Sequence, residues 1–108
     1  MPTQSTFFFG NGEITSSATA VSVLSLIIAD GYTPKGGCVS LNVTCSTNTY
    51  WGNASTVTNT DGALVTANTP FTDSGTGLTG NVIPINEMFI YNNSGGASAV
   101  VIFARFTP

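Results

Sequence analysis

Apolar and polar residues alternate most regularly between Cys38 and Cys45, where the chain reads C-V-S-L-N-V-T-C. In a strand, successive side chains point to opposite sides, so Val39, Leu41, Val43 and Cys45 would share an apolar face. Cys38 would then join the polar residues on the other face. At roughly 3.3 Å per residue the two cysteines lie about 23 Å apart, too far for a disulfide. The pattern predicts one amphipathic strand with two free thiols, which suits synthesis in a reducing cytoplasm.

Two β-rich runs, residues 87–91 and 99–106, flank the turn-forming stretch N-N-S-G-G at 92–96. Asn and Gly adopt the backbone conformations that tight turns need, so this stretch predicts a β-hairpin with a loop of several residues. Both faces of the run 99–106 are largely apolar. We therefore expect a central strand that is covered on both sides, by a second sheet or by a partner subunit.

The N-terminal stretch contains three adjacent phenylalanines, Phe7, Phe8 and Phe9, followed by G-N-G at 10–12. Asn-Gly favours a tight turn, so residues 6–9 and 13–16 are predicted to form a hairpin. Three neighbouring side chains cannot all face one core. Residues 6–9 are therefore interpreted either as a strand buried on both sides or as an arm, within residues 1–17, that packs on a neighbouring subunit.

The remaining apolar runs are short and separated by turn residues. Residues 19–28 could form a strand or a helix, and a strand that ends near Leu26 is favoured, whereas 29–37 are predicted to form a loop. Further strands are expected at 49–52 and 63–67, with turns at 53–55 and 61–62 and a loop at 72–81. No run combines a helical period with caps. About eight to ten short antiparallel strands predict an all-β fold, a β-sandwich or jelly roll, with residues 1–108 as a single domain.

The composition is poor in charge: 6% of the residues are charged and the net charge is −3, whereas average globular domains have roughly 25%. So little positive charge predicts no nucleic-acid partner and no docking on an anionic membrane. A surface made of Ser, Thr, Asn and Gly repels its own copies weakly, which favours a homo-oligomer. The start lacks a basic region, so we expect no signal peptide, and the apolar stretch 18–29 is too short to span a bilayer, which takes about 20 residues.

Candidate chemistry is sparse. The chain has no histidine, which excludes Ser-His-Asp and Cys-His catalysis and His-ligated metal sites. Residues 75–80 fit G-x-G-x-x-G, but Pro84 follows too closely for the helix that a dinucleotide site requires. We therefore expect no enzyme activity, no cofactor and no metal. The five carboxylates are spread along the chain, mostly beside turns, and this spacing favours neither a catalytic pair nor a calcium site. These carboxylates are Glu13, Asp30, Asp61, Asp73 and Glu87.

Several side chains are candidates for contacts. Trp51 and its neighbour Tyr50 would face opposite sides of a strand, and packing in a core or interface is favoured over stacking on a sugar. Arg105 is expected to pair with Glu87 on a partner strand, or else to reach an interface or a solvated edge. Glycosylation sequons at 42, 53 and 92 are expected by chance in such a composition. The predicted interface residues are Phe7, Phe8, Phe9, Trp51, Arg105 and Phe106.

The order of strand and turn stretches carries a resemblance over residues 18–106. The stretches are T-A-V-S-V-L (19–24), C-V-S-L-N-V (38–43), Y-W-G-N-A-S-T-V (50–57), G-A-L (62–64), N-T-P-F (68–71), E-M-F-I-Y-N (87–92), S-G-G (94–96) and A-V-V (99–101). In this order the chain resembles small all-β virion proteins of tailed bacteriophages, especially jelly-roll capsid decoration (cement) proteins. Related modules also occur in phage fibres.

The resemblance implies a non-enzymatic oligomer that binds the capsid surface and resists internal pressure. The expected partners are the major capsid protein and further copies of this chain, with synthesis in the host cytoplasm and a final place on the virion. Deleting residues 1–12 is expected to weaken association while sparing the fold. The alternative is a carbohydrate- or receptor-binding module of a fibre or spike, with Trp51 and the loop 72–81 as its site.

Overall fold

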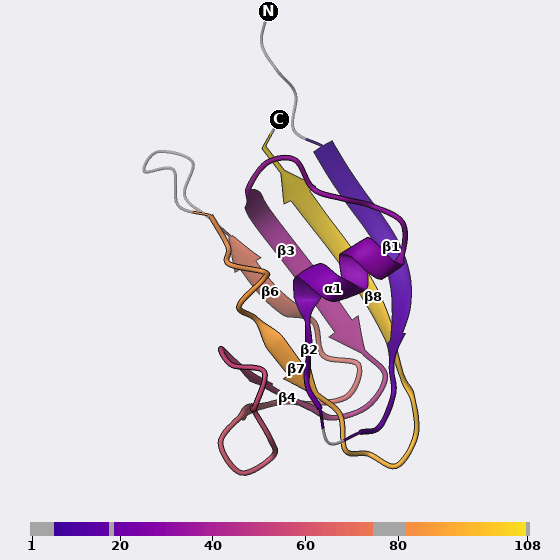
Figure 1. The fold of residues 1–108 in the computed structure, drawn as a ribbon. Coiled ribbons are helices and arrows are strands. Elements are labelled where there is room, and N and C mark those ends of the chain that lie inside the picture. Colours follow the sequence, from indigo (N-terminus) through magenta and orange to yellow (C-terminus); the bar gives the residue numbers. More distant parts are fainter. Residues whose placement is uncertain (1–5, 18, 75–81, 108) are drawn as a thin grey trace, which may run out of the picture.

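A computed structural model describes residues 6–17, 19–74 and 82–107. Within them the chain forms two four-stranded sheets, of order β1-β8-β3-β6 and β2-β7-β4-β5, in which every pairing is antiparallel (Figure 1). One short helix, α1, accompanies them. The prediction of an all-β sandwich is confirmed. The elements are β1 (Thr6–Ile14), β2 (Val21–Ser22), α1 (Val23–Ala29), β3 (Cys38–Cys45), β4 (Thr49–Gly52), β5 (Ala63–Val65), β6 (Phe71–Ser74), β7 (Phe89–Tyr91) and β8 (Ser98–Phe106).

Strand β3 has the predicted bounds, and Leu41, Val43 and Cys45 are buried on its apolar face as expected. Cys38, which the alternation places on the polar face, is also buried. The register explains the difference, because it shifts between Cys38, which faces Phe106, and Ser40, which faces Arg105. One extra residue at this irregularity turns Cys38 back toward the core.

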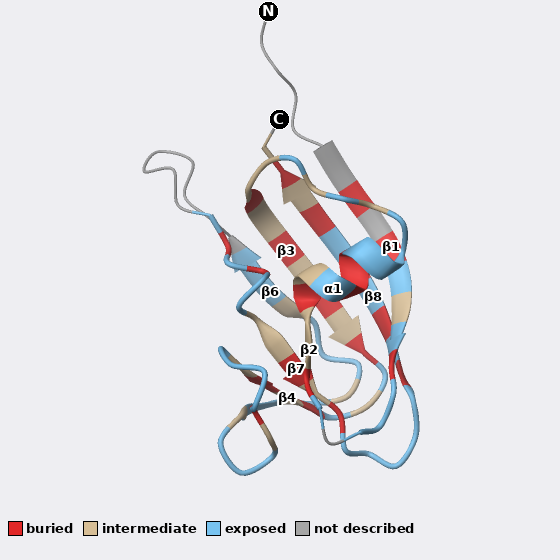
Figure 2. Cartoon of the chain, in the orientation of Figure 1, coloured by how far each residue is buried: buried red, intermediate tan, exposed pale blue. Residues whose placement is uncertain are grey.

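Strand β8 lies between β1 and β3, so its predicted central position is confirmed. Its inward residues are almost inaccessible, and Figure 2 shows buried and exposed residues alternating along the strand. On the other face Val101 and Phe103 are each 41% exposed. The expectation that both faces are covered is therefore wrong for the single chain, since no described element lies over this second side.

Strand β1 runs without interruption through the stretch at 10–12 that was predicted to be a turn. Nine residues of β1 face nine of β8 in an unbroken register, from Thr6 opposite Phe106 to Ile14 opposite Ser98. The predicted N-terminal hairpin is therefore wrong. Gly10 serves packing, because a Cβ at this position would collide with the ring of Phe8 and the carboxylate of Asp30.

Residues 19–28 do not form the predicted strand. Only β2 is extended, and α1 begins directly after it. The Ser22 side chain caps the helix by accepting a hydrogen bond of 3.1 Å from the backbone N–H of Ser25, which satisfies one of the free donors of the first turn. Val23, Leu26 and Ile27 are buried at helical spacing. The helix thus places one apolar face on the core, where it contacts β1 (Figure 1).

Strands β7 and β8 lie in different sheets, so the predicted C-terminal hairpin is wrong. The connection between them is fixed by Asn92, whose side chain is 1% exposed. Its Nδ2 donates to the carbonyls of Ile14 at 2.8 Å and Gly96 at 3.0 Å, while its Oδ1 accepts from the N–H of Ser94 at 3.1 Å. Asn92 therefore ties the crossing segment to the end of β1, and this sequon is not accessible to a glycan.

The other connections follow the predictions in part. Strand β4 has the predicted bounds, and β5 is shorter than the expected run 63–67. Strand β6 occupies part of the segment predicted as a loop at 72–81, so that prediction is wrong as far as Ser74. Residues 75–81, which contain the G-x-G-x-x-G stretch, lie outside the described residues. The Asp61 carboxylate accepts from the N–H of Thr58 at 2.8 Å, as in the predicted turn.

Candidate interaction surface

The outward side of the β1-β8-β3-β6 sheet, called the outer face below, is the feature that the rest of the fold leaves open. On β8 it carries the odd-numbered residues, because the even-numbered ones are buried. The register places Val101 between Asn11 of β1 and Thr44 of β3, and Phe103 opposite Asn42. An apolar stripe therefore runs along the central strand of the sheet. Its described members and neighbours are Ala99, Val101, Phe103, Arg105, Ser40, Asn42, Thr44, Asn11 and Glu13.

The charges of the outer face lie at its two ends. Glu13 is exposed opposite Ala99, and Arg105 is half-buried beside Ser40. At about 3.3 Å per residue the six positions from 99 to 105 separate these ends by roughly 20 Å. Between them the polar neighbours are neutral. A partner can therefore cover the middle of this face without removing a charge from water, which would cost several kcal/mol per ion.

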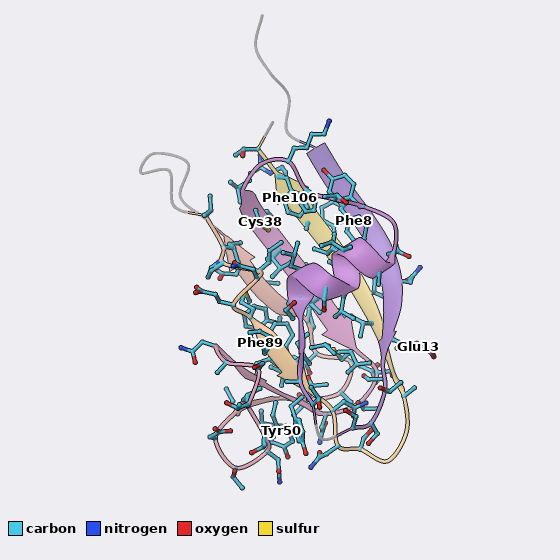
Figure 3. All side chains as sticks on the ribbon, viewed as in Figure 1. Phe8, Glu13, Cys38, Tyr50, Phe89 and Phe106 are labelled. Atoms are coloured by element: carbon cyan, nitrogen blue, oxygen red, sulfur yellow. The ribbon has the colours of Figure 1, made fainter. Side chains whose placement is uncertain are left out.

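Two of the predicted interface residues are instead core residues. Phe8 is 7% exposed and Phe106 is 1% exposed. Their rings lie 5.5 Å and 5.6 Å from the ring of Tyr32, which packs between them. Both occupy the same end of the sheet, near Cys38 (Figure 3). These positions leave the two side chains little surface for a partner.

The backbones of Phe7 and Phe9 belong to β1, opposite Arg105 and Phe103, whereas their side chains lie outside the described residues. Arg105 is on the outer face, so the structure brings it together with the exposed stripe. Its predicted partner Glu87 precedes β7 of the other sheet. The neighbours of β8 are β1 and β3, so the predicted cross-strand pair does not form.

Val101 and Phe103 were missing from the predicted interface, although the sequence contains their signal. A strand with an apolar residue at every position presents apolar groups on both sides. Which side faces the core depends on the register, and no local pattern distinguished the even-numbered residues from the odd-numbered ones. The rings of Phe103 and Phe106 lie on opposite sides of β8, and only the ring of Phe106 is buried.

Trp51 is a core residue that borders a hollow. Its indole N–H donates to Thr49 Oγ1 at 3.0 Å, and its ring stacks on Phe71 with centroids 4.4 Å apart. The hollow beside this pair has a volume of about 420 Å³ and is also lined by Met88, Asn53 and Glu87. Asn53 and Glu87 are exposed. The arrangement joins an aromatic wall to one amide and one carboxylate.

The two cysteine thiols belong to the buried core of the fold. Cys38 and Cys45 are free, as predicted, and both are buried. Burial raises the pKa of each thiol, because the thiolate would lose its hydration. The Cys38 thiol also donates a hydrogen bond of 3.3 Å to the carbonyl of Ser40. The raised pKa values disfavour the thiolate form that nucleophilic and redox chemistry use.

The described part of the chain contains neither a metal-binding cluster nor a membrane-spanning helix. Among residues 6–17, 19–74 and 82–107 no three His, Cys, Asp or Glu side chains gather where a metal ion could bind. The described helix is neither long nor apolar enough to cross a membrane.

Comparison with known proteins assigns the chain to no group. No protein-family model matches the sequence, and no curated protein or solved structure matches it either. The outer face and the Trp51 hollow are thus the features on which a functional argument can rest.

Proposed function

We propose that this protein is a virion structural protein, a capsid decoration protein that binds the capsid exterior through its outer face. The observation that supports the proposal is the apolar stripe of Val101 and Phe103 in the middle of the outer face, each 41% exposed on the central strand. The resemblance of residues 18–106 to cement proteins points the same way. On this proposal the protein is made in the host cytoplasm and ends on the capsid surface.

The stripe suits a binding mode that depends on many copies. Removing apolar surface from water contributes about 25 cal/mol per Å², and the two half-exposed side chains offer a small part of a standard interface. One contact of this kind is weak. When several copies are joined to one another, their weak contacts with a symmetric shell add up, because binding of one copy raises the effective concentration of the others. The low charge of the chain keeps neighbouring copies from repelling one another.

Replacing both stripe residues should weaken attachment without unfolding the protein. We expect the double variant V101S/F103S to bind capsids at least about tenfold more weakly per site, because each serine removes apolar contact worth roughly 1 kcal/mol. Binding is measured by sedimenting capsids with the added protein and determining the fraction that pellets. The matched control is L64S, because Leu64 is 52% exposed on β5 of the other sheet.

The control should pellet like the unchanged protein. Equal binding by V101S/F103S and L64S would remove the outer face from the proposal. The mass of the protein isolated from its native source tests the role itself. Sedimentation with megadalton particles supports it, and isolation as a free species of 11.1 kDa or a small oligomer contradicts it.

The Trp51 hollow favours a second candidate, a carbohydrate-binding module of a fibre or spike. Aromatic rings can stack on the apolar face of a sugar, while the exposed Glu87 and Asn53 could hydrogen-bond its hydroxyl groups. A decoration protein should instead bind no sugar. We expect no glycan in a broad screen to change the emission of Trp51, the single tryptophan. A glycan that does so, with an affinity reduced in E87Q, would favour the second candidate.

A further inference from the structure

We propose that two copies of this chain pair edge to edge through β1, forming one eight-stranded sheet across a two-fold axis. The inference rests on the proposed function in one respect, because it names the contact by which a decoration protein joins its own copies. It concerns the edge of the sheet rather than the outer face. The two contacts can therefore be tested separately.

Strand β1 differs from the other strands that end a sheet. The two sheets end in β1, β6, β2 and β5, which have lengths of nine, four, two and three residues. Proteins usually protect long edges with proline, lysine, a bulge or an inward-pointing charge, because an open edge is a template for a further strand. Strand β1 has none of these. Its register with β8 is unbroken, and its charged residue, Glu13, is exposed.

The hydrogen bonds of Ala99 show which groups β1 presents at its open edge. The Ala99 carbonyl accepts from the N–H of Ser46 at 2.9 Å, and its N–H donates to Ser46 Oγ at 2.8 Å. Ala99 therefore bonds on the side away from Glu13, its register partner on β1. Because bonded and non-bonded pairs alternate along antiparallel strands, the backbone N–H and C=O groups of residues 7, 9, 11 and 13 point out from the open edge.

These outward groups match a second copy of the same strand. When two β1 strands overlap completely in antiparallel orientation, residue 7 faces residue 13 and residue 9 faces residue 11. Each facing pair exchanges two hydrogen bonds. Gly10 then faces Gly10 at the two-fold axis as a non-bonded pair, in which the Cα atoms approach to about 4.5 Å. A glycine has no side chain to obstruct this approach.

The charges also favour a second copy as the partner. In this register each Glu13 faces a Phe7, and the two Glu13 carboxylates are offset by six residues, about 20 Å. That separation exceeds the Debye length of about 8 Å at physiological salt, so the carboxylates repel weakly. The pairing keeps both outer faces on the same side of the joined sheet, since residues opposite each other in an antiparallel pair point to the same side. Two stripes of Val101 and Phe103 would therefore meet the capsid together.

The variant N11P tests the edge. Proline removes the outward N–H of residue 11 and leaves the bonds between β1 and β8 in place. We expect the unchanged chain to sediment at twice the mass of 11.1 kDa and N11P to sediment as a single copy. The matched control N11T keeps the N–H and should remain paired. V101S/F103S should also remain paired, because the outer face is separate from the edge.

Amide hydrogen exchange on the unaltered chain gives the same answer without a variant. The N–H groups of residues 7, 9, 11 and 13 should exchange at least about tenfold more slowly at a concentration where the chain is paired than at high dilution. Fast exchange of these amides at every concentration, or a paired mass for folded N11P, would overturn the edge contact. Either result leaves the capsid-binding test of V101S/F103S unaffected, so the two proposals fail separately.

Discussion

A chain that lacks residues 1–12 should not fold. The deletion removes seven of the nine residues of β1 and with them the ring of Phe8, which packs against Tyr32. It also leaves one edge of β8 without a partner along most of its length. The sequence alone predicted that this deletion would spare the fold. The continuous pairing of β1 with β8 reverses that expectation.

The size of the destabilisation follows from the core contacts that the deletion removes. Truncating a buried phenylalanine costs about 3–5 kcal/mol, and the deletion also takes the strand that covers α1 on one side. Typical domains are stable by about 5–15 kcal/mol in total. We therefore expect the loss of the cooperative thermal transition, measured by circular dichroism or calorimetry. A chain that starts at Thr6 keeps β1 whole and is the matched control. A sharp transition in the shorter chain would contradict the assignment of β1.

The sequence predicted most accurately those strands whose own residue types indicate their conformation and burial. Strand β3 was predicted with its bounds because its buried face reads as a regular alternation of Leu41, Val43 and Cys45 with polar residues. Strand β8 was recognised as central because it is apolar on both sides. In both strands the relevant information is local: the residue types themselves say which conformation fits a half-buried surface.

The errors came from signals that a distant partner overrides. Asn-Gly at 11–12 is a strong turn signal, yet pairing with β8, almost ninety residues away, keeps this stretch extended. Asn92 was interpreted as part of a hairpin turn because asparagine is frequent in turns. Its buried amide instead binds Ile14, at a separation of 78 residues. A local pattern gives the preference of a segment and does not give its partner.

A strand was favoured over a helix at α1 for a related reason. The run 21–28 is rich in β-branched residues, which favour strands. The helix is seven residues long, so few turns contribute to a helical period. The spacing of Val23, Leu26 and Ile27 and the cap at Ser22 were present in the sequence. These signals favour a helix only when a core exists for its apolar face to cover, because most helical stability in proteins comes from packing.

The sequence indicated that an association surface exists, but it did not indicate which residues form that surface. Low charge and an apolar strand indicated an association surface. The register that buries residue 106 and exposes residue 103 is fixed by neighbours on both sides of β8. A shift by one residue would exchange the two faces of the strand. The residues of the outer face therefore followed from the pairing of three strands rather than from any one of them.

The same pairing predicts opposite consequences for two phenylalanines on one strand. Phe106 is 1% exposed, and its ring packs on Tyr32, so F106A should lower the free energy of unfolding by about 3–5 kcal/mol. For a domain of this size that corresponds to a fall in melting temperature of about 12 °C or more. Phe103 is 41% exposed, so F103A should cost roughly 1 kcal/mol.

Binding to capsids should follow the reverse order. Below its melting temperature, F106A keeps the outer face intact and should pellet with capsids as the unchanged protein does, whereas F103A should pellet less. Thermal melts and capsid sedimentation of the same two preparations separate stability from attachment. Equal destabilisation by the two substitutions would contradict the register of β8. Weaker binding by folded F106A than by F103A would place the contact on the side of the sheet that the structure assigns to the core.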